Sequence, residues 1–426
     1  MRNPFGYIDR FISEYYQRLK SFNKNIRLFI LYGLLAYMGV IFWGLLFTLY
    51  LQEAGYDKGS IGDVLMVSNI AVALFALPVG YLAGRYNPKR ILVLAAICSA
   101  LALIGTLSTL DKSSILVLVF LEAAMGTFVG VVSGPFIMNN STATERTYIF
   151  SISFIIMQGG GLLGNIIAGA VKDVMTQYGV PSLLAYRYTI LSGVLLSVVG
   201  IIPLLYITAS GFRKTDEKSI CLSEIAKWNW RLFLKATIPS TLISVGAGLI
   251  IQFMNLYFKD TFKSSDSSIG IYMSLSSIGV AVGSLIAPVL AEKIGKVKTI
   301  VGTELVSIPF MIVLALTRNI EIAVVVFVLR AALMNMSSPI SSTLALELCR
   351  KEEQGILNAL SMTTWSASWA LSAWLFGQVF KGNYTVCFFV AVVLYFIAAI
   401  LYYLFFHKEE KKLKTAEPFA FTPEKL

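Results

Sequence analysis

The run from Ser114 to Met138 reads SILVLVFLEAAMGTFVGVVSGPFIM and contains one charged residue, Glu122. A helix needs about 20 mainly apolar residues to cross the hydrocarbon core of a bilayer, so this run is long enough to span a membrane. Backbone groups in lipid must form their hydrogen bonds within the segment, which favours a helix over a barrel strand at this length. The run therefore predicts a transmembrane helix with an acidic residue in its interior.

Runs of the same kind fill most of the chain. Hydrophobic residues make up 57% of the sequence and charged residues 14%, whereas soluble domains are usually less than half apolar. The expected spans are residues 26–52, 61–84, 89–109, 114–138, 148–171, 186–208, 233–257, 269–291, 299–317, 320–346, 355–379 and 383–406. We predict an all-α membrane protein with twelve transmembrane helices.

The chain repeats itself at an offset of 208 residues. Residues 60–62, Ser-Ile-Gly, return at 268–270, and the block Glu-Ala-Ala-Met at 122–125 has Arg-Ala-Ala-Leu at 330–333 as its counterpart. A parallel duplication of six spans predicts two pseudo-symmetric six-helix bundles, related by an axis along the membrane normal. A binding site is then expected near the midplane between them.

The predicted domain boundaries follow the polar breaks in the sequence. Apolar residues recur at helical spacing among charged ones near the N-terminus, which is typical of a helix that lies on the membrane surface. We expect an amphipathic cytoplasmic helix at 1–25, the first bundle at 26–208, a cytoplasmic linker at 209–232, the second bundle at 233–406 and a cytoplasmic tail at 407–426.

The net charge of +11 reports on topology rather than on nucleic-acid binding. If both termini are cytoplasmic, the inner segments carry 26 of the 35 Lys and Arg residues, the outer loops carry 8, and the remaining one is Arg330. This bias is the positive-inside rule. We predict a multi-pass protein of the cytoplasmic (inner) cell membrane, in contact with anionic lipids. The four cysteines show no metal-ligand spacing, so no metal or cofactor is expected.

Short basic turns follow the second and eighth expected spans. The two turns differ at one position: the first turn has Gly84 where the second has the acidic residue Glu292. Together with the spans and the duplication, the turns resemble the signature G-x-L-a-D-r-x-G-r-k of the major facilitator superfamily, and the resemblance covers nearly the whole chain. It implies a gating motif made of Gly80, Arg85, Lys89, Arg90, Glu292, Lys293 and Gly295. The positive-inside rule alone explains the basic residues of the first turn equally well.

Two further motifs of that family match in part. Span four carries Glu122 where the family often has an arginine associated with proton coupling, and the arginine occurs instead as Arg330 in span ten. Span five has small residues but no proline at the positions of an antiporter motif: Gly160, Gly164, Asn165, Ala168 and Gly169. Close helix packing and an efflux signature both remain as explanations.

Glu122 and Arg330 are the ionisable residues deepest inside the expected spans, roughly 12–15 Å from the outer face at 1.5 Å per residue. The family resemblance implies that spans one, four, seven and ten surround a central cavity, which both residues would face. A lone buried charge costs several kcal/mol, so the two are expected to pair. Two explanations of the pair remain open. The ion pair only stabilises one conformational state of the protein, or it acts as a switch in which Arg330 binds an anionic substrate group and Glu122 carries a proton.

Aromatic and amide residues within the spans are candidates to line a substrate pocket. As a group they suit an amphipathic solute or a sugar, although ordinary packing explains each of them singly. The candidates are Tyr37, Trp43, Gln158, Gln252, Asn255, Asn335, Trp365 and Trp369.

These features predict a monomeric secondary active transporter that works by alternating access. Its expected partners are a small-molecule substrate, protons and membrane lipids, and proton-coupled export of an amphipathic or anionic compound is the main hypothesis. Proton-coupled uptake or facilitated diffusion of a sugar-like or organic-acid nutrient is the alternative. A transport-dead membrane sensor or scaffold would need an output domain, for which the short loops leave no room. An enzyme is not expected, because the spans contain no Ser/His or metal cluster.

Overall fold

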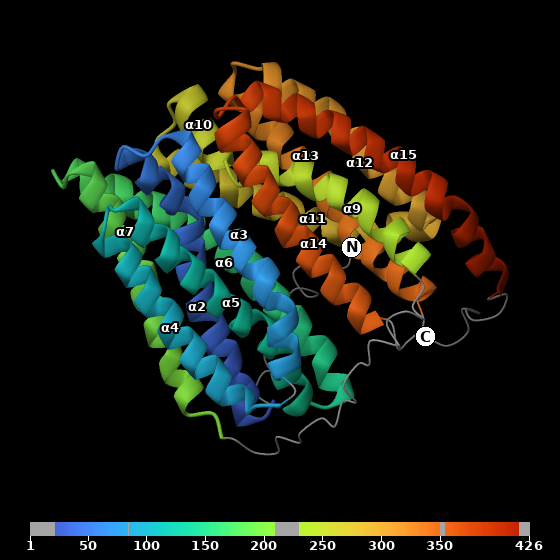
Figure 1. The fold of residues 1–426 in the computed structure, drawn as a ribbon, viewed down its shortest axis with the longest axis horizontal. Coiled ribbons are helices and arrows are strands. Elements are labelled where there is room, and N and C mark those ends of the chain that lie inside the picture. Colours follow the sequence, from blue (N-terminus) through green and yellow to red (C-terminus); the bar gives the residue numbers. More distant parts are fainter. Residues whose placement is uncertain (1–21, 84, 209–229, 350–353, 417–426) are drawn as a thin grey trace, which may run out of the picture. The chain divides into compact units, whose positions relative to one another are not determined.

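Every regular element in the described part of the chain is a helix (Figure 1). The computed structural model describes residues 22–83, 85–208, 230–349 and 354–416. Each of the twelve expected spans lies largely on described helices, which confirms the predicted all-α fold class.

The chain divides into two compact units, which are described separately. Unit 1 comprises Met1–Ser219 with Ser264–Ser274, and unit 2 comprises Ile220–Lys263 with Leu275–Leu426. One helix, α11 (Asp266–Ile294), is shared, because its first residues belong to unit 1 and the rest to unit 2.

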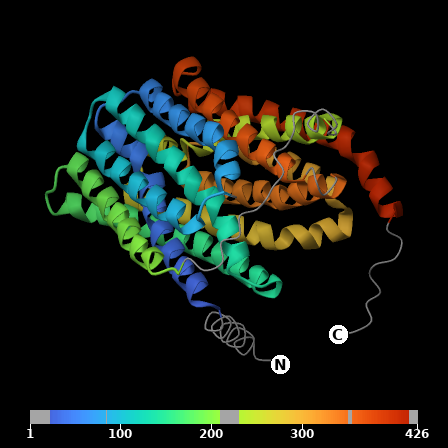
Figure 2. The ribbon, with the colours of Figure 1, turned by 60° about the horizontal axis from the view of Figure 1, so that its bottom comes forward.

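Unit 1 is a bundle in which α2 packs along α6 and α7, and α5 packs along α3 and α4 (Figure 1, Figure 2). Side-chain caps fix where four of the helices begin, because Asn23, Asn87, Asp111 and Thr142 each accept a hydrogen bond from an otherwise unpaired N–H group of the first turn. The helices are α2 (Lys24–Glu53), α3 (Lys58–Ala83), α4 (Pro88–Ser108), α5 (Lys112–Asn139), α6 (Ala143–Gln177) and α7 (Ser182–Leu205).

Unit 2 is built around α12, which packs against α13 and α15, while α9 packs against α14 and α15. Besides its share of α11, the unit contains α9 (Trp230–Ile251), α10 (Met254–Phe262), α12 (Lys296–Leu316), α13 (Ile320–Leu348), α14 (Gln354–Trp374), the π-helical turn η2 (Leu375–Val379) and α15 (Tyr384–Ala416).

The seventh expected span, 233–257, is not one continuous helix. It is divided into α9 and α10 by a break at residues 252 and 253. The eleventh span also changes its winding, because α14 continues directly into the π-helical turn. Both irregularities lie in unit 2, and irregular turns of this kind are often found at functional sites.

Ten of the described helices are long and apolar enough to cross a membrane. The expected spans 148–171 and 355–379 lie on the other two long helices, α6 and α14, which are richer in hydroxyl, amide and glycine residues. The two most polar spans are therefore candidates for contact with something other than lipid.

Two helices extend beyond the predicted ends of the second bundle. Helix α9 begins at Trp230, inside the expected linker, and α15 continues through the start of the expected tail to Ala416. Nearly all of the amphipathic helix expected at 1–25, most of the linker and the last residues of the tail lie outside the described residues.

Apolar side chains fill the interior of each unit and also cover much of its outside. The cluster around Phe22, Phe29 and Phe136 forms a core in unit 1, and the cluster around Phe233, Ile300 and Phe406 forms one in unit 2. Large side chains such as Leu285 and Leu404 are more than 60% exposed. Exposed apolar side chains on long helices are what a lipid environment requires, which agrees with the predicted membrane protein.

Candidate functional site

Glu122 lies in the middle of α5 and points toward α4. Its carboxylate oxygen Oε1 accepts a hydrogen bond from the Ser99 hydroxyl at 3.4 Å, and the side chain is half-buried. The small residue Gly126, one turn further along α5, leaves room beside this oxygen, since a Cβ atom there would lie 3.8 Å from it. Among the described residues, the hydrogen bond that holds the Glu122 carboxylate is therefore a weak one with a neutral group.

Arg330 is enclosed within unit 2. Its guanidinium Nη2 donates a hydrogen bond to the Tyr395 hydroxyl of α15 at 2.7 Å, and only 2% of the residue is exposed. The predicted pairing of Arg330 with Glu122 stays a prediction, because the two residues belong to different units. The burial and the Tyr395 bond favour a role inside unit 2 over direct contact with a solute.

The break between α9 and α10 brings three of the predicted pocket residues together. The Gln252 amide lies in the break and donates to the carbonyl oxygens of Gly248 in α9 and Trp369 in α14, at 3.1 Å each. The rings of Trp365 and Trp369 have their centroids 5.6 Å apart. The side chain of Trp365 is 46% exposed, whereas the buried indole N–H of Trp369 has no hydrogen-bond partner among the described residues.

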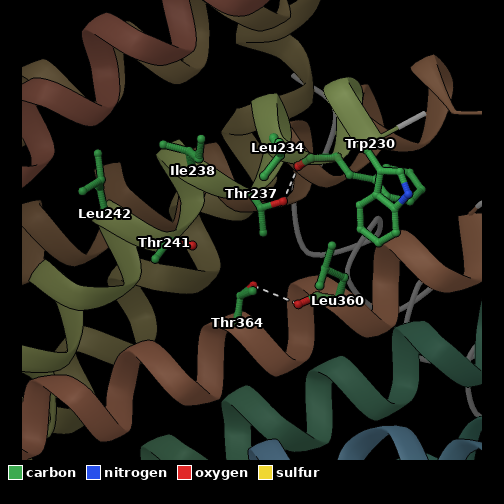
Figure 3. A pocket seen from close by; sticks show the side chains of 9 residues that line it. Trp230, Leu234, Thr237, Ile238, Thr241, Leu242, Leu360 and Thr364 are labelled. Carbon is green, nitrogen blue, oxygen red and sulfur yellow. Dashed lines mark hydrogen bonds between the residues drawn. The ribbon is translucent and has the colours of Figure 1, made fainter. Parts of the chain in front are cut away.

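A cavity of about 370 Å³ lies between the first halves of α9 and α14, and Gln252, Trp365 and Trp369 are not among its lining residues (Figure 3). The hydroxyls of Thr237 and Thr364 bond to carbonyl oxygens of their own helices, so the threonines contribute their methyl groups to the lining. The lining residues are Trp230, Phe233, Leu234, Thr237, Ile238, Thr241, Leu242, Leu360 and Thr364. The cavity is therefore apolar, and Thr364 in its wall directly precedes Trp365.

The remaining predicted pocket residues make local contacts. Trp43 stacks on Phe47 of the same helix with ring centroids 3.7 Å apart, and Asn335 donates to the Ala331 carbonyl oxygen at 2.9 Å. Tyr37 of α2 packs closely on Gly160 of α6, next to Gln158, and Asn255 is buried in α10. Of the predicted pocket residues, the described contacts bring together Gln252, Trp365 and Trp369.

The basic turn in unit 1 ties helix ends together. Asn87 caps α4, and the Lys89 ammonium donates to the carbonyl oxygen of Leu205 at the end of α7, 2.7 Å away. A cation at a helix C-terminus is favourable because the last carbonyl groups carry partial negative charge. Arg85 and Arg90 are exposed, as is Gly80, and Gly84 lies outside the described residues.

In unit 2 the acidic partner of a helix N-terminus is not the motif residue Glu292, which is exposed together with Lys293. The carboxylate of Glu410 in α15 instead accepts the backbone N–H groups of Lys296 and Val297, at 2.7 and 3.2 Å. Gly295 makes the turn into α12 with a φ of 96°, a conformation that favours glycine. The spacing of the motif indicated the turn correctly, but the carboxylate comes from a residue more than 100 positions away.

One buried polar cluster of unit 1 is absent from the predicted site residues. Lys172 of α6 forms an ion pair with Asp266 at the start of α11, and the Tyr186 hydroxyl of α7 donates to the same carboxylate at 2.8 Å. The carboxylate of Asp173 accepts the Ser267 N–H at 2.7 Å. We refer to Lys172, Asp173, Tyr186, Asp266 and Ser267 as the α6–α11 clamp.

The sequence signal for this clamp was a pair of glycines rather than the charges. A Cβ atom on Gly169 would lie 2.3 Å from the Asp266 carbonyl oxygen, and one on Gly270 would lie 2.3 Å from the Asn165 carbonyl oxygen. The backbones of α6 and α11 therefore lie closer together than a residue with a side chain would allow. Small residues permit such close approach between membrane helices. This contact supports the packing explanation of the small residues in span five.

Comparison with known proteins identifies the family. The model of the Major Facilitator Superfamily matches residues 28–238 and again residues 238–425. No curated protein sequence matches the chain.

Solved transporter structures share the fold. A point variant of the nucleoside transporter NupG is 15% identical, with a TM-score of 0.74 over 89% of this chain and 100% of that chain. A bacterial homologue of the human lysosomal transporter Spinster, inward-facing and unoccupied, is 14% identical, with a TM-score of 0.72 over 93% of this chain and 98% of that one. A D-xylose-proton symporter is 14% identical, with a TM-score of 0.69 over 90% and 97%. Since the family model matches nearly the whole chain, once in each half, this protein belongs to the major facilitator superfamily of membrane transporters.

Proposed function

We propose that this protein is a secondary transporter that moves a small amphipathic organic solute by alternating access, coupled to protons. The observation that carries the proposal is the break at Gln252, whose amide bonds to Trp369, a residue whose indole N–H has no partner in the described part of the chain. Discontinuous helices are common at transporter binding sites, because their exposed backbone groups and side chains can bind a solute within the membrane.

The chemistry of this group favours a solute with a hydrogen-bond acceptor attached to an apolar body. A buried N–H group without a partner costs about 1–3 kcal/mol, which an acceptor on the solute would offset. The exposed ring of Trp365, whose centroid lies 5.6 Å from that of Trp369, suits the hydrocarbon part. A carboxylate, carbonyl or hydroxyl group on the solute would meet the donor requirement.

Glu122 is the proposed coupling residue in unit 1. Its carboxylate accepts a hydrogen bond from the neutral Ser99 hydroxyl, and a carboxylate in such a place within a membrane span is stabilised by binding a proton. Export driven by proton entry is the proposed direction. Uptake of a sugar-like solute is the second candidate, favoured by the combination of two indole rings with an amide at Gln252.

The test is solute transport in proteoliposomes with an imposed pH gradient, using a panel of amphipathic acids, amphipathic cations and sugars. Wild type is expected to accumulate one class against its gradient, and Glu122→Gln is expected to lose the response to pH while retaining exchange. Glu321→Gln, at the exposed first turn of α13, is the matched control and should behave as wild type.

A second variant tests the binding group itself. Trp369→Phe keeps an aromatic ring but removes the indole N–H, and it is expected to weaken apparent affinity about 5- to 150-fold, the equivalent of 1–3 kcal/mol. Transport by Glu122→Gln that depends on pH as in wild type would rule out the coupling role. Unchanged affinity in Trp369→Phe would rule out the binding role.

A further inference from the structure

A second buried carboxyl group lies in unit 2, among the packed helices α12, α13 and α15. Glu304 of α12 is 1% exposed, and Arg330 of α13 and Tyr395 of α15 are 2% and 0% exposed. Glu304 is close enough to Tyr395 and Tyr402 to interact with both hydroxyl groups electrostatically. The interior of this unit therefore contains an acid, a base and a phenol in one neighbourhood.

Two polar atoms of this cluster have no hydrogen-bond partner among the described residues. They are Oε2 of Glu304 and Nε of Arg330. The guanidinium uses Nη2 for its bond to Tyr395, and none of the described ion pairs joins it to Glu304 within 4 Å. An acid and a base thus share the interior without neutralising each other by contact.

The other charged groups named near α12 are either paired or exposed. From α15, Glu410 is bonded to the backbone at the start of α12, and from α13, Glu347 is paired with Lys296 at 2.5 Å. Lys298 on α12 itself is exposed. The described residues contain no group of three or more metal-ligating side chains that could hold a metal ion beside Glu304.

A buried carboxylate without a cation in contact costs several kcal/mol, and the group avoids this cost by taking up a proton. We propose that Glu304 is a proton-binding residue of unit 2 and that Arg330 is its alternating partner. With the proton bound, Glu304 is a neutral acid and Arg330 donates to Tyr395. When the proton leaves, the Glu304 carboxylate is stabilised by the Arg330 guanidinium, which releases the Tyr395 hydroxyl.

A proton on Glu304 can be detected without knowing the solute. Only the link between this proton and transport rests on the proposed function. It places a proton site in unit 2 that is separate from Glu122 in unit 1. The two sites can therefore be tested independently, and the failure of one leaves the other standing.

Infrared difference spectroscopy on the purified full-length protein tests the proton directly. A protonated carboxyl group has a carbonyl-stretch band that moves on exchange into D₂O, and wild type at neutral pH is expected to show such a band that Glu304→Gln lacks. Glu321→Gln is the control for an exposed carboxylate, and both spectra are repeated in the Glu122→Gln background to remove any band of Glu122. The same band in wild type and Glu304→Gln would overturn the proposal.

The pH at which the band disappears tests the partner. Loss of a nearby cation favours the protonated acid, so Arg330→Gln is expected to move this midpoint upward by about 1–3 pH units. Tyr395→Phe frees the guanidinium to approach the carboxylate and is expected to move the midpoint downward. If Arg330→Gln does not fold, the test rests on Tyr395→Phe. An unchanged midpoint in whichever of these variants folds would exclude Arg330 as the partner.

Discussion

Equivalent residues of the two halves have acquired different partners. Ser99 and Ser307 stand 208 positions apart, as do Glu122 and Arg330. In unit 1 the serine hydroxyl donates to Glu122, whereas in unit 2 Ser307 donates to the Glu304 backbone carbonyl oxygen at 2.6 Å. The second serine also lies 3.1 Å from the sulfur of Met334, one turn along α13 from the residue that replaced the acid. At this scale the duplication retained positions but not interactions.

Asp111 in the loop before α5 is expected to make the start of that helix depend on pH. Its carboxylate accepts the backbone N–H and the hydroxyl of Ser114, each at 2.8 Å, and these hydrogen bonds hold the pKa of Asp111 below its usual value. A carboxyl group whose pKa is lower in the folded than in the unfolded state stabilises the fold above its unfolded pKa. That contribution is lost as the pH falls through the folded pKa.

Asp111→Ala is therefore expected to speed amide hydrogen exchange in the first turn of α5 at pH 7, with a smaller effect in Asp111→Asn, which still caps. As the pH falls below the pKa of Asp111 in the folded protein, which lies under the unfolded value of about 3.9, the difference between wild type and Asp111→Ala should shrink to that between Asp111→Asn and Asp111→Ala, because a protonated carboxyl group still caps as the amide does. Hydrogen–deuterium exchange with mass spectrometry measures this. An equal difference at pH 3 and pH 7 would show that the charge of Asp111 is irrelevant.

Some elements are readable from the sequence and others are not. Apolar length predicts the helices, because each must satisfy its own backbone in lipid. The break at Gln252 is not predictable, since no glycine or proline stands between Ile251 and Met254 and the contact with Trp369 comes from a distant helix. Likewise, spacing alone cannot show that Arg330 points to Tyr395, 65 positions along the chain.

The α6–α11 clamp is expected to depend on Gly169. A methyl group there would lie 2.3 Å from the Asp266 carbonyl oxygen, so Gly169→Ala must push apart the two backbones that the Lys172–Asp266 ion pair joins. Overpacking of this kind costs about 1–3 kcal/mol. The thermal unfolding midpoint in detergent is expected to fall accordingly.

Gly159→Ala is the matched control on the same helix, because a methyl group at Gly159 would have no neighbour within 4 Å. Both substitutions replace glycine by alanine in a helix, which favours the helix by about 1 kcal/mol in each case. The difference between the unfolding midpoints of the two variants therefore isolates the contact with α11. Equal midpoints for the two variants would show that α6 and α11 do not approach each other this closely in the membrane.

On the scale of the whole chain, the family model matches once in each half, as the repeat at an offset of 208 predicts. Membership of the family does not fix how this chain is oriented in its membrane. The distribution of charge does so by a separate physical argument, because Lys and Arg near span ends resist translocation. With 26 such residues on one side and 8 on the other, we expect both termini to be cytoplasmic.

Cysteine labelling of intact cells tests this orientation. In a variant lacking the four native cysteines, Ser113→Cys at the exposed start of α5 is expected to react with a membrane-impermeant maleimide from outside. Lys298→Cys, exposed at the start of α12, should react only after the cells are permeabilised. The opposite pattern would place the 26 basic residues outside, against the rule that predicts the orientation. Labelling of both sites in intact cells would show that α5 and α12 begin on the same side, which the order of the spans forbids.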